Sequence, residues 1–351
     1  MRFSIGINME RRSPDEDIRA VEANALELVL MAEEAGFEKV WIPEHHGIEM
    51  IIAPNPFVIA ASWAAQTKRI RLGTATIVAP YWHPLRLAGE AALTDLMSGG
   101  RLELGIARGA FQYEFDRLAG GLPQERGGDY VREIVPLILK LWRGDCAHDG
   151  LWRFPAVTSV PKPVQTPHPP LYIGARSPET FGWAIENGLH IMSTPLQRPF
   201  SDVEFLAQKL ATAVAERNPA HKPRFMVLRR GCVYESPNDW TRVVPVVLEY
   251  AQKFQSLFHN KKGVRNGFPD LVRLDDMPQS ADLTPEAIRE NLMFGTPDEV
   301  VRKLKRYEAV GVEEFCLGAT FGLDHEMTKR SIALFEREVM PHFKRHGARI
   351  P

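Results

Sequence analysis

Residues 2–43 read RFSIGINMERRSPDEDIRAVEANALELVLMAEEAGFEKVWIP, and this stretch predicts a strand, a helix and a second strand. The apolar and β-branched segments at 2–8 and 38–43 are typical of buried strands. Between them, Ser13 suits the cap of a helix and Gly36 suits its end. Apolar residues spaced three and four apart would give that helix one face to pack on a sheet. The stretch is therefore expected to form one strand–helix–strand unit of a parallel sheet.

The same alternation repeats along the rest of the chain. Further strands are predicted at 69–78, 101–107, 171–174, 189–193, 223–235 and 313–319, with helical stretches between them. About eight strand–helix units without a compositional break predict a single domain over residues 1–351. That number favours an α/β fold of the (β/α)8 TIM-like barrel type over an open doubly wound sheet. The G-x-G-x-x-G fingerprint of open nucleotide-binding sheets does not occur in the sequence.

Two segments are too long for ordinary connections. Residues 144–170 are rich in proline, and residues 259–284 are polar and interrupted by glycine and proline. We expect both to be extended loops between a strand and a helix of the barrel. The second leaves the side of the seventh strand, so it is a candidate lid over the catalytic face, with a merely mobile surface loop as the alternative.

The composition is that of a soluble globular protein, with 44% hydrophobic and 25% charged residues and a net charge of −1. This balance gives no electrostatic basis for binding nucleic acid or an anionic membrane. The N-terminus lacks a signal-peptide pattern, and no apolar run approaches the roughly 18 residues of a membrane span. We therefore expect a cytoplasmic protein. Three widely separated cysteines argue against a disulfide framework or a structural zinc site.

The densest polar cluster of the sequence is WIPEHHG at residues 41–47. Glu44, His45 and His46 follow the carboxyl end of a predicted barrel strand, where the active sites of barrels are built. Adjacent residues of an extended chain point in opposite directions, so the two imidazoles do not easily bind one metal ion. No second cluster of ligands supports a metal site, and we predict none. A structural imidazole that hydrogen-bonds across the barrel mouth is the alternative to a catalytic one.

Arg108 ends another predicted strand, within GIARG at residues 105–109. Small neighbours would let a flat ligand approach the backbone, and a guanidinium pairs well with phosphate or an electron-rich ring. An exposed arginine in an ordinary surface ion pair explains the same pattern equally well.

A clearer signal lies at residues 173–183, IGARSPETFGW. Ser177 is expected to cap a helix whose free backbone N–H groups face outward with the helix dipole behind them. This arrangement is a phosphate seat, which Arg176 and the hydroxyls of Ser177 and Thr180 can complete. The alternative is an ordinary capped helix without a ligand.

Nearly the whole chain resembles the bacterial luciferase-like, flavin-dependent monooxygenases, most strongly over residues 36–126. The segments GFEKVWIPEHHG, PNPFVIAAS, LGTATIVAPYWHPLR, LTDLMSGGRLELGIARGAFQYEFDRLAG and Arg126 stand in the order and spacing of the luciferase α subunit. Two departures matter. Arg176 stands where the luciferase branch has an acid, and Ser193 and Thr194 stand where it has an aromatic residue. We therefore do not expect the long-chain aldehyde substrate of luciferase.

The resemblance implies a TIM-like barrel that binds reduced FMN, with His45 as the catalytic imidazole. It also implies a strained, cis non-proline peptide at Ala75 and Thr76 against the flavin ring. Contacts to flavin or its phosphate are implied for Arg108, Arg126, Ser177 and Thr180.

Reduced flavin reacts with O₂ to give a C4a-hydroperoxide, which must be shielded from water and hydrogen-bonded at its distal oxygens. An imidazole can hold this peroxide and move its proton, and we expect His45 to do so, oriented by Glu44 and His46. The expected function is a two-component monooxygenase that uses reduced FMN to insert one oxygen atom of O₂ into a small organic molecule.

The chain lacks a nicotinamide fingerprint, so we expect a separate NAD(P)H:flavin reductase to supply the reduced FMN. A homodimer or a heterodimer is also expected. The nearest alternative function is hydride transfer with the deazaflavin F420 on the same barrel. A metal-dependent hydrolase and a non-catalytic flavin carrier are more distant alternatives.

Overall fold

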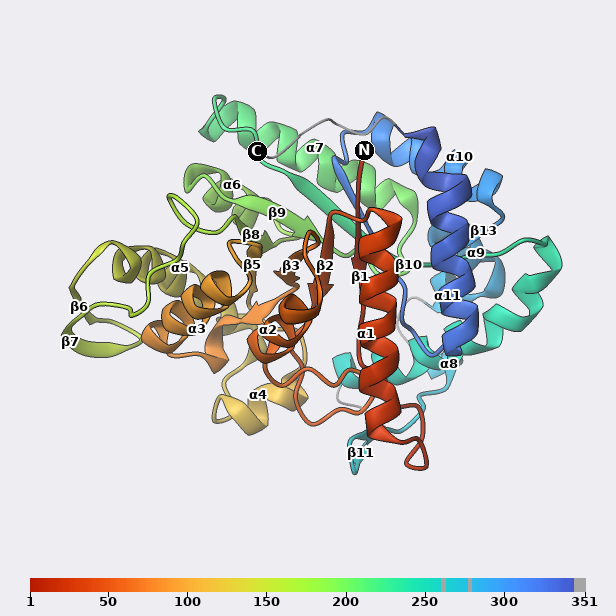
Figure 1. Ribbon diagram of the computed structural model, residues 1–351, viewed down its shortest axis with the longest axis horizontal. Helices are drawn as coiled ribbons and strands as arrows, with labels where there is room; N and C mark the ends of the chain where they lie inside the picture. Colours follow the sequence, from red (N-terminus) through yellow and green to blue (C-terminus); the bar gives the residue numbers. More distant parts are fainter. Residues whose placement is uncertain (260–262, 277–279, 344–351) are drawn as a thin grey trace.

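The computed structural model describes residues 1–259, 263–276 and 280–343, and its central feature is a closed barrel of parallel strands (Figure 1). Each strand pairs with the next around the ring, and the last pairs with the first. The barrel strands are, in ring order, Arg2–Gly6 (β1), Lys39–Ile42 (β2), Arg71–Thr74 (β3), Leu102–Ala107 (β5), Leu171–Gly174 (β8), His190–Ser193 (β9), Phe225–Val233 (β10) and Glu314–Gly318 (β14). The predicted (β/α)8 barrel is confirmed.

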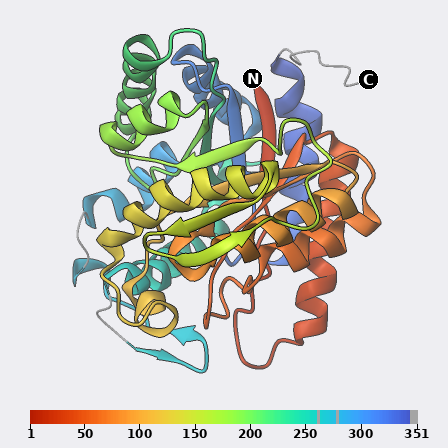
Figure 2. The same ribbon diagram turned by 90° about the vertical axis from the view of Figure 1, so that its left-hand side faces the viewer.

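Helices surround this barrel on all sides (Figures 1 and 2). They are Ile18–Ala35 (α1), Pro56–Gln66 (α2), Pro84–Met97 (α3), Gln112–Leu118 (α4), Gly127–Arg143 (α5), Pro178–Glu186 (α6), Phe200–Arg217 (α7), Trp240–His259 (α8), Pro285–Asn291 (α9), Pro297–Ala309 (α10) and His325–Leu334 (α11). In the described part of the chain, no helix has both the length and the apolar character needed to cross a membrane.

The first helix starts later than its sequence pattern predicts. It begins at Ile18 and is capped by Asp17, whose side chain accepts a hydrogen bond from the Arg19 N–H at 3.0 Å. The predicted cap, Ser13, lies outside it because the Glu16 carboxylate accepts the Arg12 N–H at 2.6 Å and closes a turn before the helix. The predicted end is correct: Gly36 has a φ of 82°, a left-handed conformation that glycine adopts without steric cost.

The single strand predicted at 69–78 is two strands. Arg71–Thr74 (β3) belongs to the barrel ring, and Ile77–Val78 (β4) pairs only with β5. Ala75 and Thr76 lie between them and are joined by a cis peptide bond, as the family resemblance implied.

The two long segments differ in their position. Residues 144–170 follow helix α5 and precede strand β8, so the expectation of a strand-to-helix loop was wrong for this segment. They carry the hairpin Cys146–Asp149 (β6) and Arg153–Val157 (β7), which faces the viewer beside α5 in Figure 2. The other long segment follows α8 and carries Val264–Arg265 (β11) and Phe268–Pro269 (β12), while Met293–Gly295 (β13) pairs with β10 further along.

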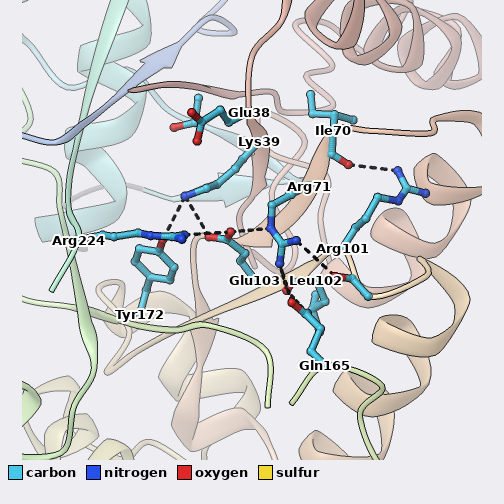
Figure 3. A network of polar contacts seen from close by, with 12 residues as sticks. Glu38, Lys39, Ile70, Arg71, Arg101, Leu102, Glu103, Gln165, Tyr172 and Arg224 are labelled. Carbon is cyan, nitrogen blue, oxygen red and sulfur yellow. Dashed lines mark hydrogen bonds and ion pairs between the residues drawn. The ribbon is translucent and has the colours of Figure 1, made fainter. Parts of the chain in front are cut away.

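The amino-terminal end of the barrel is filled by charged side chains (Figure 3). The Lys39 ammonium lies 3.0 Å from a Glu103 carboxylate oxygen and also pairs with Glu314, and all three side chains are buried. The other Glu103 oxygen accepts hydrogen bonds from Arg71 at 2.7 Å and Arg224 at 3.3 Å. A buried charge is tolerated only when it is paired, so these pairs link the starts of the strands that carry them.

The opposite, carboxyl-terminal end of the strands forms the barrel mouth. Helix α4, helix α8 and strand β11 gather at this end in Figure 1, away from the N-terminus. All the predicted site residues follow β2, β3, β5 or β8, or begin the helices beyond them, so the parallel arrangement brings them to this same face.

Candidate active site

His45 is held at the barrel mouth by its backbone and by its ring. Its N–H donates to the carbonyl of Ala53 at 3.1 Å, and its imidazole stacks on Phe111 with 5.0 Å between ring centroids. Nδ1 lies 3.2 Å from a carboxylate oxygen of Glu114, and the His45 side chain is 17% exposed. A carboxylate on Nδ1 fixes the tautomer and leaves Nε2 for a ligand. Within the described residues nothing hydrogen-bonds to that second nitrogen.

Glu114 is the residue that sequence reasoning missed. Its carboxylate is 2% exposed and also accepts the backbone N–H of His46 at 2.7 Å, so it binds both members of the histidine pair. Helix α4 carries Glu114 in its first turn and is anchored by the buried rings of Phe111 and Phe115. The available signal was an acid in FQYEFDRL, soon after the strand that ends at Ala107.

Glu44 and the His46 ring form a second network, which is joined to the first through the backbone N–H of His46. Buried Glu44 accepts hydrogen bonds from His46 Nε2 at 3.0 Å, from the Val78 N–H at 2.6 Å and from Trp82 Nε1 at 2.9 Å. Glu44 therefore connects the residues after β2 to the end of β4 and to Trp82 beyond it. The expectation that Glu44 and His46 orient the His45 ring is revised, because Glu114 makes that contact. Within the described residues, no group of three or more His, Cys, Asp and Glu side chains is placed to hold a metal ion.

The cis peptide between Ala75 and Thr76 lies between the histidine pair and the predicted phosphate seat. The Ala75 N–H donates to the carbonyl of Ile42 at 2.7 Å, at the end of the strand that carries His45. On the other side, a Cβ added to Gly174 would lie 3.6 Å from the Thr76 methyl carbon. Both residues are half-buried, so this peptide forms part of the floor of the barrel mouth.

The predicted phosphate seat forms as a capped helix N-terminus. Ser177 is the cap of α6: its hydroxyl accepts the Thr180 N–H at 3.4 Å and lies 2.9 Å from the Thr180 hydroxyl. Arg176 donates to the carbonyl of Thr194. Both hydroxyls and the first-turn N–H groups lie at the positive end of the helix dipole, which favours an anion.

Positive charge gathers beside this helix end. Desolvation and the charges of Arg229 and Arg108 lower the pKa of the Arg176 guanidinium, and the charge of Asp202 only partly offsets them. Neither Arg108 nor Arg176 pairs with a carboxylate from the part of the chain that the structure describes. Two neighbouring guanidiniums without acidic partners would be stabilised by a bound anion such as a phosphate group.

Arg126 precedes a glycine that packs against Arg108, but its own side chain pairs with Asp129. Its Nε donates to the Asp129 carboxylate at 2.6 Å, and both side chains are exposed at the start of α5. The following residue, Gly127, packs so closely that an added Cβ would lie 2.1 Å from the carbonyl oxygen of Arg108. A contact from Arg126 to flavin therefore stays a prediction.

Aromatic side chains cover the His45 side of the mouth. Phe254 and Phe258 of α8 contact Phe111 with centroid separations of 5.4 and 4.8 Å. The segment after α8 is tied down as well, because the Glu49 N–H donates to the carbonyl of Gly267 at 2.8 Å. Parts of the predicted lid, residues 260–262 and 277–279, lie outside the described residues, and lid movement stays a prediction.

Comparison with known proteins places the chain in a family. The family model described as luciferase-like monooxygenase matches residues 1–314. The flavin-dependent trigonelline monooxygenase, oxygenase component, of Acinetobacter baylyi is 38% identical over 344 residues, which cover 98% of this chain and 96% of that protein.

Two solved structures share the barrel. The oxygenating constituent of 3,6-diketocamphane monooxygenase from Pseudomonas putida, in complex with FMN, superposes with a TM-score of 0.76, 19% identity and coverage of 98% and 99% of the two chains. An F420-dependent secondary alcohol dehydrogenase superposes with a TM-score of 0.74, 19% identity and the same coverage. These two likenesses concern the fold alone, whereas the family match and the 38% identical relative concern the sequence. The chain belongs to the luciferase-like monooxygenase family.

Proposed function

We propose that the protein is the oxygenase component of a two-component system, which uses reduced FMN to insert one oxygen atom of O₂ into a small organic substrate. The observation that carries this proposal is the His45–Glu114 pair, an imidazole fixed by a buried carboxylate at the mouth of the barrel. The name of the Acinetobacter relative, an oxygenase component, supports the two-component arrangement. Trigonelline, which that name contains, is the first substrate to assay.

The residues at the mouth fit FMN. The phosphate would bind at the N-terminus of α6, on the Ser177 and Thr180 hydroxyls and the guanidiniums of Arg108 and Arg176. The flavin ring would lie along the Ala75–Thr76 peptide, toward His45. When bound, reduced FMN would supply the electrons for the activation of O₂.

His45 would act through Nε2. Glu114 holds Nδ1, so the ring keeps one tautomer, and Nε2 can donate or accept a hydrogen bond at the reacting oxygen and move its proton. Phe111, Phe254 and Phe258 would exclude water from this nitrogen, which strengthens its hydrogen bonds.

Arg176→Ala tests the phosphate seat. Loss of a charge-assisted hydrogen bond should weaken FMN binding by roughly 1.5 to 3 kcal/mol. Riboflavin lacks the phosphate and should bind the variant and the wild type equally, as measured by fluorescence titration. Arg217→Ala is the matched control, because Arg217 pairs with Glu186 at the other end of α6, at 2.7 Å. An equal loss of affinity for both ligands would show damage to the fold instead of loss of a phosphate contact.

The source of reduced FMN gives an independent prediction. The purified chain with NADPH, FMN and substrate should not consume O₂ above the background rate, because it has no nicotinamide fingerprint. Addition of a flavin reductase should start turnover, measured with an oxygen electrode and by product analysis. Substrate oxygenation by the chain and NADPH alone would contradict the two-component proposal.

The F420-dependent secondary alcohol dehydrogenase has the same fold, so hydride transfer with F420 is the alternative function to test. The apoprotein should be titrated with FMN, reduced FMN and F420 under identical conditions. Tighter binding of F420 than of reduced FMN, with hydride transfer and no use of O₂, would replace the oxygenase proposal by a hydride-transfer one.

A further inference from the structure

A second feature of the barrel mouth is a cavity of about 170 Å³, lined by Glu10 after β1, by α8 and by the β12 segment. We call it the Glu10 cavity. Its apolar walls come from Met50, Val246, Tyr250, Phe268 and Pro269. A cavity of about 150 Å³ holds one benzene molecule, so this volume suits a single-ring organic group.

Most charged groups of the cavity wall are already paired within the protein. Each makes an ion pair of 3.5 Å or less: Arg11 with Glu49, Arg12 with Glu16, and Lys253 with Glu249. These side chains have their partners whether or not a ligand is bound.

Glu10 is the exception. One oxygen of its carboxyl group accepts the Gly322 N–H at 2.7 Å, while the other is buried and has no hydrogen-bond partner among the described residues. Burial raises the pKa of Glu10 to about 7, although the Gly322 N–H, the charge of Arg230, the Asn8 side chain and the charge of Arg12 oppose this rise. A buried carboxyl oxygen without a partner is unfavourable, and a ligand donor or cation would satisfy it.

Arg230 belongs to barrel strand β10, and its charge acts on the Glu10 carboxyl group. Its guanidinium covers the rings of Tyr250 and Phe254 at 4.5 and 4.6 Å and has no carboxylate within 4 Å in the described part of the chain. Its charge favours ionised Glu10 but opposes a cationic ligand, so a neutral isostere of the ligand is a necessary comparison.

The cavity is linked to His45 by a row of aromatic rings. Tyr250 stacks on Phe254 at 6.1 Å, Phe254 meets Phe111 at 5.4 Å, and Phe111 stacks on His45 at 5.0 Å. Met50 of the cavity wall also belongs to the loop that follows His45. A ligand group in the cavity would therefore sit on the same face of the barrel as the reacting end of the site.

We propose that the Glu10 cavity binds the positively charged nitrogen of a small organic substrate, with the free Glu10 oxygen as its counter-ion and the apolar walls around its ring or alkyl groups. The role of this ligand as a substrate rests on the proposed oxygenase function. Binding of the cation itself depends only on the cavity. Aromatic and apolar walls around a carboxylate are a suitable environment for an alkylated ammonium or pyridinium group.

Binding of N-methylpyridinium, measured by calorimetry without flavin, reductase or O₂, tests the proposal. Toluene is the neutral isostere. At pH 8 the wild type should bind the cation more tightly than toluene. Glu10→Gln should weaken binding of the cation roughly ten- to hundredfold and leave toluene unchanged, because only the charge-assisted contact is lost.

The matched control is Glu249→Gln, a carboxylate of the same cavity that already pairs with Lys253. Because Glu249→Gln also frees the Lys253 ammonium in the same cavity, it should weaken binding of the cation, but less than Glu10→Gln does. Glu186→Gln, which changes a carboxylate outside the cavity that pairs with Arg217 at 2.7 Å, should bind the cation as the wild type does. A loss in Glu249→Gln or Glu186→Gln as large as that in Glu10→Gln, or equal affinity of the wild type for the cation and toluene, would overturn the proposal. Thermal unfolding of each variant checks that it is folded.

The pH dependence gives a second readout. Below the Glu10 pKa of about 7, affinity for the cation should fall about tenfold per pH unit, because the carboxyl group takes up a proton. The other groups that face Glu10 are Arg11, Arg12, Lys253, Glu249, Tyr250 and Arg230. Glu10→Gln should remove this dependence, and its persistence would assign the binding to another group.

Different results would contradict the proposed function and the cavity proposal. An enzyme that oxygenates a neutral substrate without preferring the cation contradicts only the cavity proposal. A chain that binds the cation through Glu10 but never oxygenates a substrate with reduced FMN contradicts only the oxygenase proposal.

Discussion

His45→Ala should bind reduced FMN almost as tightly as the wild type and yet oxygenate substrate roughly 10²- to 10⁴-fold more slowly, the range for loss of a general acid–base group. FMN binding should survive because the phosphate seat lies on α6, which follows another strand of the barrel. Flavin oxidation should continue and release hydrogen peroxide instead of product. The measurement is product formed and peroxide released per flavin oxidised, with reduced FMN supplied directly.

Two comparisons make this prediction specific. His148→Ala removes an imidazole of hairpin β6–β7, which pairs with Glu133 at 2.8 Å, and should leave the coupling unchanged. Glu114→Gln keeps a hydrogen-bonding group beside His45 and should lower oxygenation less than His45→Ala does. If His45→Ala forms product at the wild-type rate, the imidazole has no role in the reaction.

Lys39→Met should lower the free energy of unfolding by about 3 to 5 kcal/mol, the usual cost of removing one partner from a buried ion pair. Methionine fills much of the lysine volume but leaves Glu103 and Glu314 buried near each other without the ammonium that pairs with both. Urea unfolding followed by fluorescence measures this change. Because the network lies at the end of the barrel opposite His45, the folded fraction should keep its activity.

The double variant Lys39→Met with Glu314→Gln is the control. Removing one buried negative charge should restore part of the lost stability, whereas a simple packing defect would not respond to it. Burial alone would raise the pKa of Glu103, but Lys39, Arg71 and Arg224 lower it to about 2. The stabilisation that ionised Glu103 gives the folded protein is therefore complete above about pH 4.5 and is lost as the pH falls toward 2. When the pH is lowered, the Lys39→Met variant should unfold at a higher pH than the wild type does.

Sequence patterns located the barrel strands and the C-terminus of α1 well, but the start of that helix less well. The end of α1 depends only on the backbone conformation of Gly36. The start of α6 depends on a hydrogen bond between Ser177 and Thr180, three positions away. Ser13 offered an equally plausible cap, but the turn closed by Glu16 moved the helix start to Ile18. Competing caps within a few residues cannot be ranked without the contacts that fix the preceding turn.

The sequence by itself determined the order of strands and helices, the place of His45 beyond the second strand and the capped helix at Ser177, because these depend on side chains within a few positions of one another. Only the tertiary structure decided the partners of the buried charges. Glu114 meets His45 across 69 positions, Lys39 meets Glu314 across 275, and Glu10 meets Gly322 across 312. The Lys39 and Glu10 contacts exist because closing the barrel pairs its first strand with its last, and the Glu114 contact exists because the ring brings the residues after β2 and β5 to one face. The register of the strands is a property of the whole ring that no local pattern carries.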